Sequence, residues 1–182
     1  SSTDQWLCIS SDYMSMHIAL CHKDYIIELC VIEKKLANQR LLSDIKNILN
    51  KHNLIFADLS FIGINVGPAP YTGLRIAIAT VNGLHSATGI PIVEIDALKA
   101  YIHHYLPQNK NQLTIALLNA FNNDLFYAIA DYEGNLHIGY ENSIILHERI
   151  AKEFPNLTIN WIGNATNRLN EGYPSQEQLI SY

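Results

Sequence analysis

The chain has 182 residues, of which 48% are hydrophobic and 16% are charged, and its net charge is −5. This composition indicates a globular protein, and the length suffices for one large domain or two small lobes. No apolar run approaches the length of a transmembrane helix and no signal-peptide pattern opens the sequence, so we expect a cytoplasmic protein without membrane contact. The largest cluster of basic residues is the pair Lys34 and Lys35. The sequence therefore lacks the charge pattern of a protein that binds nucleic acid without a partner.

The candidate metal-binding and nucleophilic residues show no catalytic spacing. The cysteines Cys8, Cys21 and Cys30 are odd in number and lie in strand-like segments, so we expect buried, reduced thiols. No two of the eight histidines are four residues apart, as they would be on a zinc-binding helix, and no Gly-x-Ser-x-Gly motif is present. The sequence therefore predicts no metal site and no nucleophile.

Apolar segments separated by polar turns predict an α/β chain with two similar halves. The first half is predicted as three strands, a helix, a strand, a helix, a strand and a helix, at residues 6–10, 16–21, 25–32, 36–51, 59–66, 72–87, 91–95 and 97–106. The second half is predicted as three strands, a helix and a strand, at residues 113–120, 125–132, 136–143, 147–154 and 157–163.

A polar segment, 107–112, separates the halves and predicts an N-terminal lobe at 1–106 and a C-terminal lobe at 107–182. The repeated β-β-β-α-β order is typical of the actin/hexokinase-like (ASKHA) fold, which consists of two ribonuclease-H-like lobes. Because the second repeat stops soon after its fifth element, we expect the second lobe to be shortened.

The turn before the 72–87 helix is rich in glycine and proline but does not match a phosphate-binding P-loop. Five residues rather than four separate Gly67 from Gly73, and the lysine and hydroxyl residue that should follow are replaced by Leu74 and Arg75. The turn is therefore interpreted as a helix start, with Thr72 as the N-cap.

The helix that follows is apolar on nearly its whole circumference, so it must be covered on two sides. Ala79, Gly83 and Ala87 recur every four residues and form a stripe on which another helix could pack closely. A central core helix and a partner surface both explain this pattern. Arg75 opposes the helix dipole and needs either a carboxylate, from this chain or a partner, or full solvation.

These residues carry a family resemblance. Residues 67–84, GPAPYTGLRIAIATVNGL, resemble the GPGSFTGLR-IG-AT-GLA signature of the TsaB (YeaZ) family, and the similarity continues through 89–98. WLCISSDYMSMHIAL at 6–20 and LLNAFNNDLFYAIAD at 117–131 are similar to two further family segments. The resemblance thus covers about residues 6–132.

The resemblance implies a non-catalytic scaffold in the synthesis of threonylcarbamoyladenosine, a tRNA modification beside the anticodon. The partner TsaD would form a heterodimer with this chain and transfer the threonylcarbamoyl group from its adenylate to tRNA adenosine, and the ATPase TsaE would join them. It further implies that this chain holds no cofactor, that ATP and metal bind to the partner subunits, and that tRNA is contacted through the complex. A homodimer through the same surface is plausible when the partner is absent.

The family builds its partner interface from its first two helices, which implies a set of candidate interface residues here. They are Leu41, Leu42, Ile45, Ile48, Leu49, Thr72, Arg75, Ile76, Ala79, Thr80, Gly83, Leu84 and Ala87.

The sequence departs from the enzymes of the ASKHA fold at the nucleotide site. Ser10 stands where those enzymes have a magnesium-binding carboxylate, and Asp12 is the candidate for a displaced ligand. Asn119 and Phe121 replace the charged pair of the family's Asp-Ala-Arg segment. We therefore expect a degenerate nucleotide site, with a kinase or ATPase, or a peptidase acting on the partner, as the alternative functions.

Overall fold

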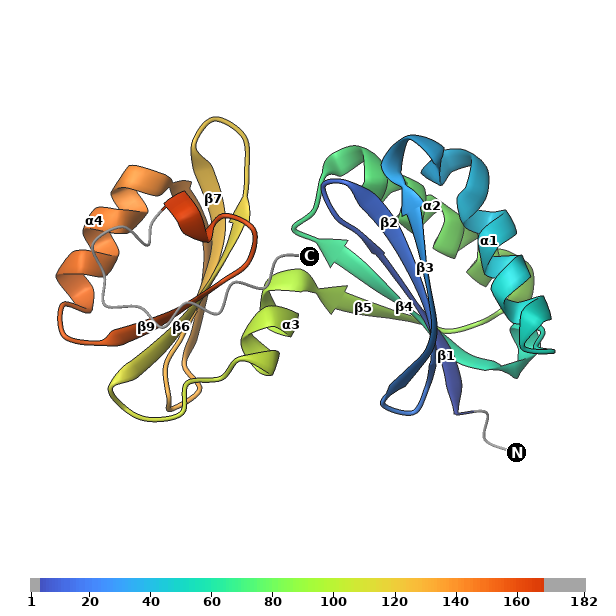
Figure 1. The fold of residues 1–182 in the computed structure, drawn as a ribbon, viewed down its shortest axis with the longest axis horizontal. Helices are drawn as coiled ribbons and strands as arrows, with labels where there is room; N and C mark the ends of the chain where they lie inside the picture. Colours follow the sequence, from blue (N-terminus) through green and yellow to red (C-terminus); the bar gives the residue numbers. More distant parts are fainter. Residues whose placement is uncertain (1–3, 169–182) are drawn as a thin grey trace. The chain divides into compact units, whose positions relative to one another are not determined.

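The computed structural model describes residues 4–168, which form two compact units divided between Ala97 and Leu98 (Figure 1). The division falls ahead of the polar segment 107–112, at which the sequence analysis placed the lobe boundary. The helix α3 (Ala97–His104) accordingly groups with the second unit. Its C-terminal end is tied there because the Thr114 hydroxyl donates to the Tyr105 carbonyl.

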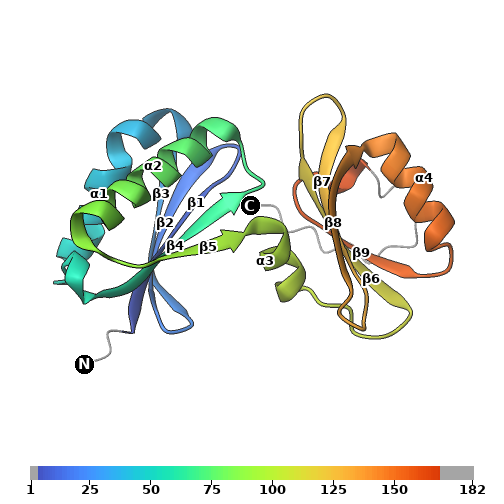
Figure 2. The same cartoon turned by 180° about the vertical axis from the view of Figure 1, so that it is seen from behind.

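The first unit is a five-stranded sheet with two helices on one face. Its elements are β1 (Gln5–Ser11), β2 (Ser15–His22), β3 (Tyr25–Glu33), α1 (Ala37–Lys51), β4 (Leu59–Gly67), α2 (Tyr71–Thr88) and β5 (Ile92–Asp96). The strand order is β3-β2-β1-β4-β5, with β1, β2 and β3 antiparallel and β1, β4 and β5 parallel. Helix α1 packs on β2 and β3, α2 packs on β1 and β4, and the two helices contact each other (Figure 2).

The core of the first unit lies between this sheet and its helices. Leu7 pairs with Leu20 and with Ile62 across three neighbouring strands, so their side chains share the face that α1 and α2 cover. On the other face, Leu29 and Val31 of the edge strand β3 are exposed. The alternation in burial along most of β1 and along the second half of β3 is what a sheet with one covered face requires.

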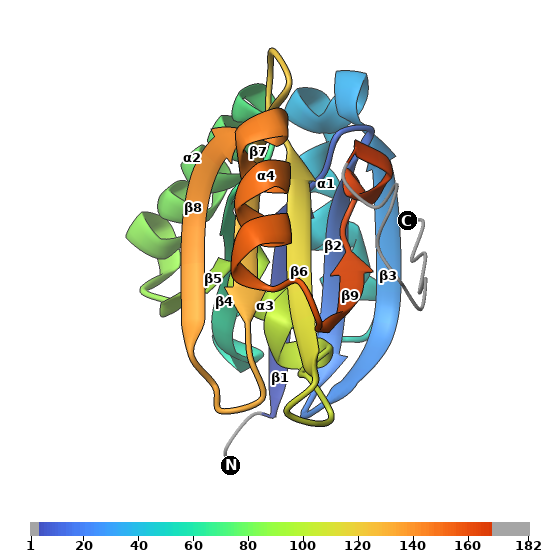
Figure 3. The same ribbon diagram turned by 90° about the vertical axis from the view of Figure 1, so that its left-hand side faces the viewer.

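The second unit repeats the first part of this plan. Its elements are β6 (Gln112–Asn119), β7 (Asp124–Ala130), β8 (Leu136–Asn142), α4 (Ser143–Glu153) and β9 (Thr158–Ile162). The strand order is β8-β7-β6-β9, and α4 covers one face of this sheet (Figure 3). The predicted β-β-β-α-β repeat is thereby confirmed. Three short 3-10 turns, at Lys34–Leu36, Phe56–Asp58 and Thr166–Arg168, complete the described elements.

Most predicted elements begin and end within one or two residues of the observed ones, but α4 begins four residues early. The sequence analysis started this helix at residue 147, whereas it begins at Ser143. Asn142 caps it, its side-chain oxygen accepting from the amide of Ile144 at 3.1 Å. The cap is the last residue of β8, so the strand pattern masked the helix start.

The three cysteines are unpaired, as predicted, but only Cys21 is fully buried. Cys8 and Cys30 are half-buried, which corrects the expectation for these two. Burial, and secondarily the nearby Cys21, raises the pKa of Cys8 to about 11. The described helices include none that is long and apolar enough to cross a membrane.

Candidate functional site

The helix α2 starts directly after the glycine-proline turn. Pro70 occupies the N-cap position with φ −58° and ψ 130°, and its carbonyl accepts the first helical hydrogen bond, from Leu74. The N-cap makes no side-chain hydrogen bond, and Thr72 lies inside the first turn with its side chain exposed. The prediction that Thr72 is the N-cap is therefore wrong, because Pro70 fixes the backbone geometry that starts the helix two residues earlier.

Gly73 allows the first turn of α2 to approach the end of β1. A Cβ at this position would collide with the hydroxyl oxygen of Ser11, which is itself buried. The glycine of the Gly-Leu-Arg motif thus serves close packing between a strand end and a helix start.

Asp12 is engaged within its own turn between β1 and β2. Its carboxylate accepts from the amides of Met14 at 2.7 Å and Ser15 at 2.6 Å, and lies 2.8 Å from Nε2 of His17. Burial acts to raise the pKa of Asp12, but the hydrogen bonds from His17 and the two amides outweigh it, so the pKa lies below its ordinary value. The carboxylate is accordingly a turn-stabilising group with few lone pairs left for a ligand.

The Ser10 hydroxyl, at the position of the missing carboxylate, accepts from Nδ2 of Asn65 at 3.0 Å. The strands β1 and β4 are thus linked by a neutral hydrogen bond at this end of the sheet. Within residues 4–168, no three His, Cys, Asp or Glu side chains are grouped to hold a metal ion.

Helix α2 is covered on one side and exposed on the other. Its buried positions, Gly73, Ala77, Val81 and Leu84, face the sheet. Along the opposite side run four exposed residues at a spacing of four, which we name the α2 row: Arg75, Ala79, Gly83 and Ala87. In the described part of the chain, apart from the neighbouring residues and backbone of α2 itself, no atom lies within 4 Å of the position that a Cβ of Gly83 would take. The explanation of the stripe as part of the core is therefore wrong for this chain, and a partner surface stays a prediction.

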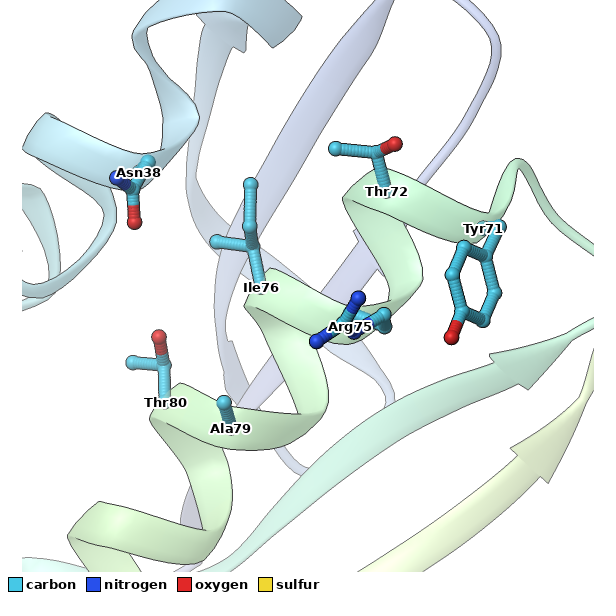
Figure 4. A pocket seen from close by; sticks show the side chains of 7 residues that line it. All are labelled: Asn38, Tyr71, Thr72, Arg75, Ile76, Ala79 and Thr80. Atoms are coloured by element: carbon cyan, nitrogen blue, oxygen red, sulfur yellow. The ribbon is translucent and has the colours of Figure 1, made fainter.

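A groove of about 380 Å³ opens beside the N-terminal half of the α2 row. It is lined by Asn38, Tyr71, Thr72, Arg75, Ile76, Ala79 and Thr80, and Figure 4 shows Asn38 facing the others from α1. Arg75 is the single charged residue of this lining, and its guanidinium lies over the Tyr71 ring at 5.2 Å from the ring centre. Polar and apolar groups thus share a concave surface between the two helices.

The structure brings together some of the predicted interface residues and buries others. Thr72, Arg75, Ile76, Ala79 and Thr80 line the groove, and Gly83 and Ala87 continue from it along the α2 row.

The prediction is corrected where the side chains lie in the core of the first unit and have no free surface to offer a partner. These residues are Leu41, Ile45, Ile48, Leu49 and Leu84. Leu42, which is 44% exposed, is the one member of the α1 set that remains accessible.

Sequence reasoning missed two groove residues, Asn38 and Tyr71. Tyr71 could have been found, since it lies four residues before Arg75 and so shares its helix face. Asn38 carries no such signal, because its place in the groove depends on how α1 packs against α2.

Comparison with known proteins identifies relatives for most of the chain. The family model described as TsaD, tRNA N6-adenosine threonylcarbamoyltransferase, matches residues 32–164. TsaB from Buchnera aphidicola subsp. Acyrthosiphon pisum is 25% identical over 157 residues, which are 85% of this chain and 71% of that protein. TsaB from Escherichia coli is 26% identical over 69% of this chain and 54% of its own length. TsaB from Bacillus subtilis is 31% identical over 51% of this chain and 41% of its own length.

Solved structures share the fold. YeaZ from Pseudomonas aeruginosa superposes with a TM-score of 0.68 at 21% identity, covering 94% of this chain and 83% of that one. Lmo2764 from Listeria monocytogenes, a candidate N-acetylmannosamine kinase, gives a TM-score of 0.53 at 10% identity, covering 90% and 84%. The predicted actin/hexokinase-like fold is confirmed. Since the family model matches well over half of the sequence, the chain belongs to this threonylcarbamoyltransferase-type family, and within it to the TsaB (YeaZ) proteins of tRNA threonylcarbamoyladenosine biosynthesis.

Proposed function

We propose that this chain is a non-catalytic scaffold that forms a heterodimer with a TsaD-type transferase through the α2 row and the groove beside it. The observation that carries the proposal is the exposed row of Ala79, Gly83 and Ala87 on a helix whose other side is buried against the sheet. Small residues at a spacing of four allow a second helix to approach closely, and burying them removes the apolar surface of Cα and methyl groups from water.

The end of β1 supports the non-catalytic part of the proposal. A phosphoryl-transfer site of this fold needs a carboxylate there to hold magnesium, whereas Ser10 offers a neutral hydroxyl. Asp12 lies two residues further along the chain, and its carboxylate already accepts hydrogen bonds from the turn amides and lies within hydrogen-bond distance of His17. ATP and metal are accordingly assigned to the partner subunits in this proposal, with no cofactor in this chain.

The proposed assembly contains the TsaD-type subunit and a TsaE-type ATPase in the cytoplasm. With a net charge of −5, this chain is poorly suited to attract tRNA, so the assembly would contact tRNA through its partners. In the absence of the TsaD-type subunit, the same α2 row would support a homodimer.

The test is size-exclusion chromatography with light scattering on this chain mixed with the TsaD homologue of the same genome, with and without ATP. A one-to-one complex that Gly83→Leu abolishes is the expected result, because the leucine side chain would occupy the space of the approaching helix. Ala151→Leu, which adds the same side chain to an exposed position on α4, is the matched control and should leave the complex intact. Two separate peaks for the unmodified proteins, with and without ATP, would contradict the proposal.

The alternative functions make different predictions. A kinase or ATPase of this fold would bind ATP as an isolated chain and lose that binding in Asp12→Asn, whereas a peptidase would cleave the purified partner. We expect neither binding nor cleavage. Calorimetric titration of the isolated chain with ATP and magnesium, and electrophoresis of the partner after incubation, measure the two outcomes directly.

A further inference from the structure

Two cationic side chains lie near the N-terminal end of α2. The first turn contains no acidic residue, so the positive end of the helix dipole is uncompensated by a side chain there. Lys34 adds a cation, its Cε lying 3.9 Å from the position that a Cβ of Gly73 would take. Arg75 adds a second cation one turn into the helix. Two cations thus lie at the start of α2 in a chain whose net charge is −5, with the Asp12 carboxylate of the neighbouring turn held by its own hydrogen bonds.

Within residues 4–168, Arg75 forms no ion pair and no hydrogen bond through its guanidinium. Its guanidinium lies over the Tyr71 ring, whose π face attracts the cation but accepts no conventional hydrogen bond from the N–H groups of the guanidinium. The stacking restricts the guanidinium and leaves its five donors to another group. A guanidinium held in this way has the geometry that binds a carboxylate through two parallel hydrogen bonds.

We propose that the groove receives an aspartate or glutamate side chain of the TsaD-type partner, paired with Arg75. This inference rests on the function proposed above. The groove contains no acidic residue, and its other lining groups include the amide of Asn38 and the hydroxyl of Thr80, which can donate to a carboxylate oxygen. Charge complementarity therefore selects an anionic group.

The α2 row favours an anion that belongs to a protein. Beyond Arg75 the row continues with Ala79, Gly83 and Ala87, which offer packing surface and no donor for a phosphate. A partner helix lying on these residues would place one of its side chains over Arg75. The pair would become partly desolvated on association and would so contribute to the specificity as well as the strength of the complex.

The experiment measures the dissociation constant of the complex for four chains: unmodified, Gly83→Leu, Arg75→Gln and the control Lys152→Gln. Lys152 is an exposed residue of α4 in the second unit. Its substitution also removes one positive charge, but at a position distant in sequence from the α2 row. We expect Arg75→Gln to weaken binding at least about tenfold and Lys152→Gln to leave it unchanged. We also expect Arg75→Glu to be rescued by reversing one acidic residue of the partner.

The outcomes separate the two proposals. Failure of the unmodified chain to bind overturns both. Binding that Gly83→Leu weakens but Arg75→Gln does not, or the lack of any rescuing charge reversal, overturns the carboxylate contact and leaves the heterodimer standing. The carboxylate contact would also be overturned, in favour of a small-anion site, if the isolated chain bound inorganic phosphate or ATP saturably and Arg75→Gln abolished that binding.

Discussion

The hydroxyl of Ser11 occupies the space where a side chain at Gly73 would begin. The end of β1 and the first turn of α2 are therefore packed more closely than any residue except glycine permits. We expect Gly73→Ala to lower the free energy of unfolding by about 1–2 kcal/mol, since the cost of overpacking exceeds the gain in helix propensity. Urea unfolding measures the loss. Ser11→Gly in the Gly73→Ala background should recover part of it, and simple additivity of the two changes would contradict the packing argument.

Gly83 is the matched opposite case on the same helix. Because the described part of the chain leaves its Cβ position empty, Gly83→Leu should fold and should gain up to about 1 kcal/mol from improved helix propensity. Thermal unfolding checks this at a concentration at which light scattering finds the isolated chain monomeric, because a homodimer would cover the α2 row. Gly139→Ala is the contrast, since a Cβ at Gly139 would collide with the Tyr127 hydroxyl. A destabilised Gly83→Leu chain would show that the α2 row is covered in solution.

The carboxylate of Glu28 links β3 to the C-terminal end of α1. It lies 2.8 Å from Nζ of Lys51 and 2.6 Å from Nε2 of His52, and these two hydrogen bonds hold the pKa of Glu28 below its ordinary value. A carboxyl group whose pKa is lower in the folded state stabilises the fold above its ordinary pKa of about 4.3, and this contribution is lost as pH falls through the lower folded value.

We therefore expect Glu28→Gln to reduce stability at pH 7 and to flatten the decline of stability below about pH 4. Urea midpoints measured across this range test the prediction. Glu33→Gln is the control: it removes the same charge from the last residue of β3, where Glu33 forms an exposed ion pair with Lys35 of the following turn. Equal pH dependence in the two variants would mean that the Glu28 contacts contribute nothing in solution.

The cap of α4 can be tested separately. Asn142→Ala removes the oxygen that accepts from Ile144 and should cost about 1 kcal/mol, whereas Asn142→Ser keeps an acceptor and should cost less. Aspartate is a poorer control here because Nδ2 of Asn142 lies 3.3 Å from Oδ1 of Asp124, which would repel a second carboxylate. Thermal unfolding of the three chains ranks the costs, and an alanine variant as stable as the serine variant would contradict the capping role.

Apolar periodicity was sufficient to predict nearly every strand and helix, because burial against one sheet face imposes the two- and 3.6-residue periods directly on the sequence. It could not say what covers an apolar face. In α1 the residues Leu41, Ile45 and Ile48 form a clear stripe, and they pack on the chain's own sheet instead of a partner.

The candidate site was predictable only in part for the same reason. The α2 row consists of small residues whose spacing is visible in the sequence, so Ala79, Gly83 and Ala87 were identified. Asn38 was not, because it reaches the groove from another helix, and the fold decides which helices are neighbours. Thr72 was wrongly predicted as the N-cap because threonine favours that position, whereas the fixed φ of Pro70 constrains the backbone more strongly and starts the helix earlier.

The environment of the cysteines has a practical consequence for studying the α2 row. Burial raises the pKa of all three thiols, to about 11 for Cys8, so each has a smaller thiolate fraction at neutral pH than an exposed cysteine. Maleimide and nitroxide reagents attack the thiolate and will therefore react slowly with the natural cysteines. A single cysteine introduced at the exposed Ala87 would carry a fluorophore or spin label selectively, without a cysteine-free background. The chain is thus suited to spectroscopy that detects whether the α2 row becomes covered when the proposed partner is added.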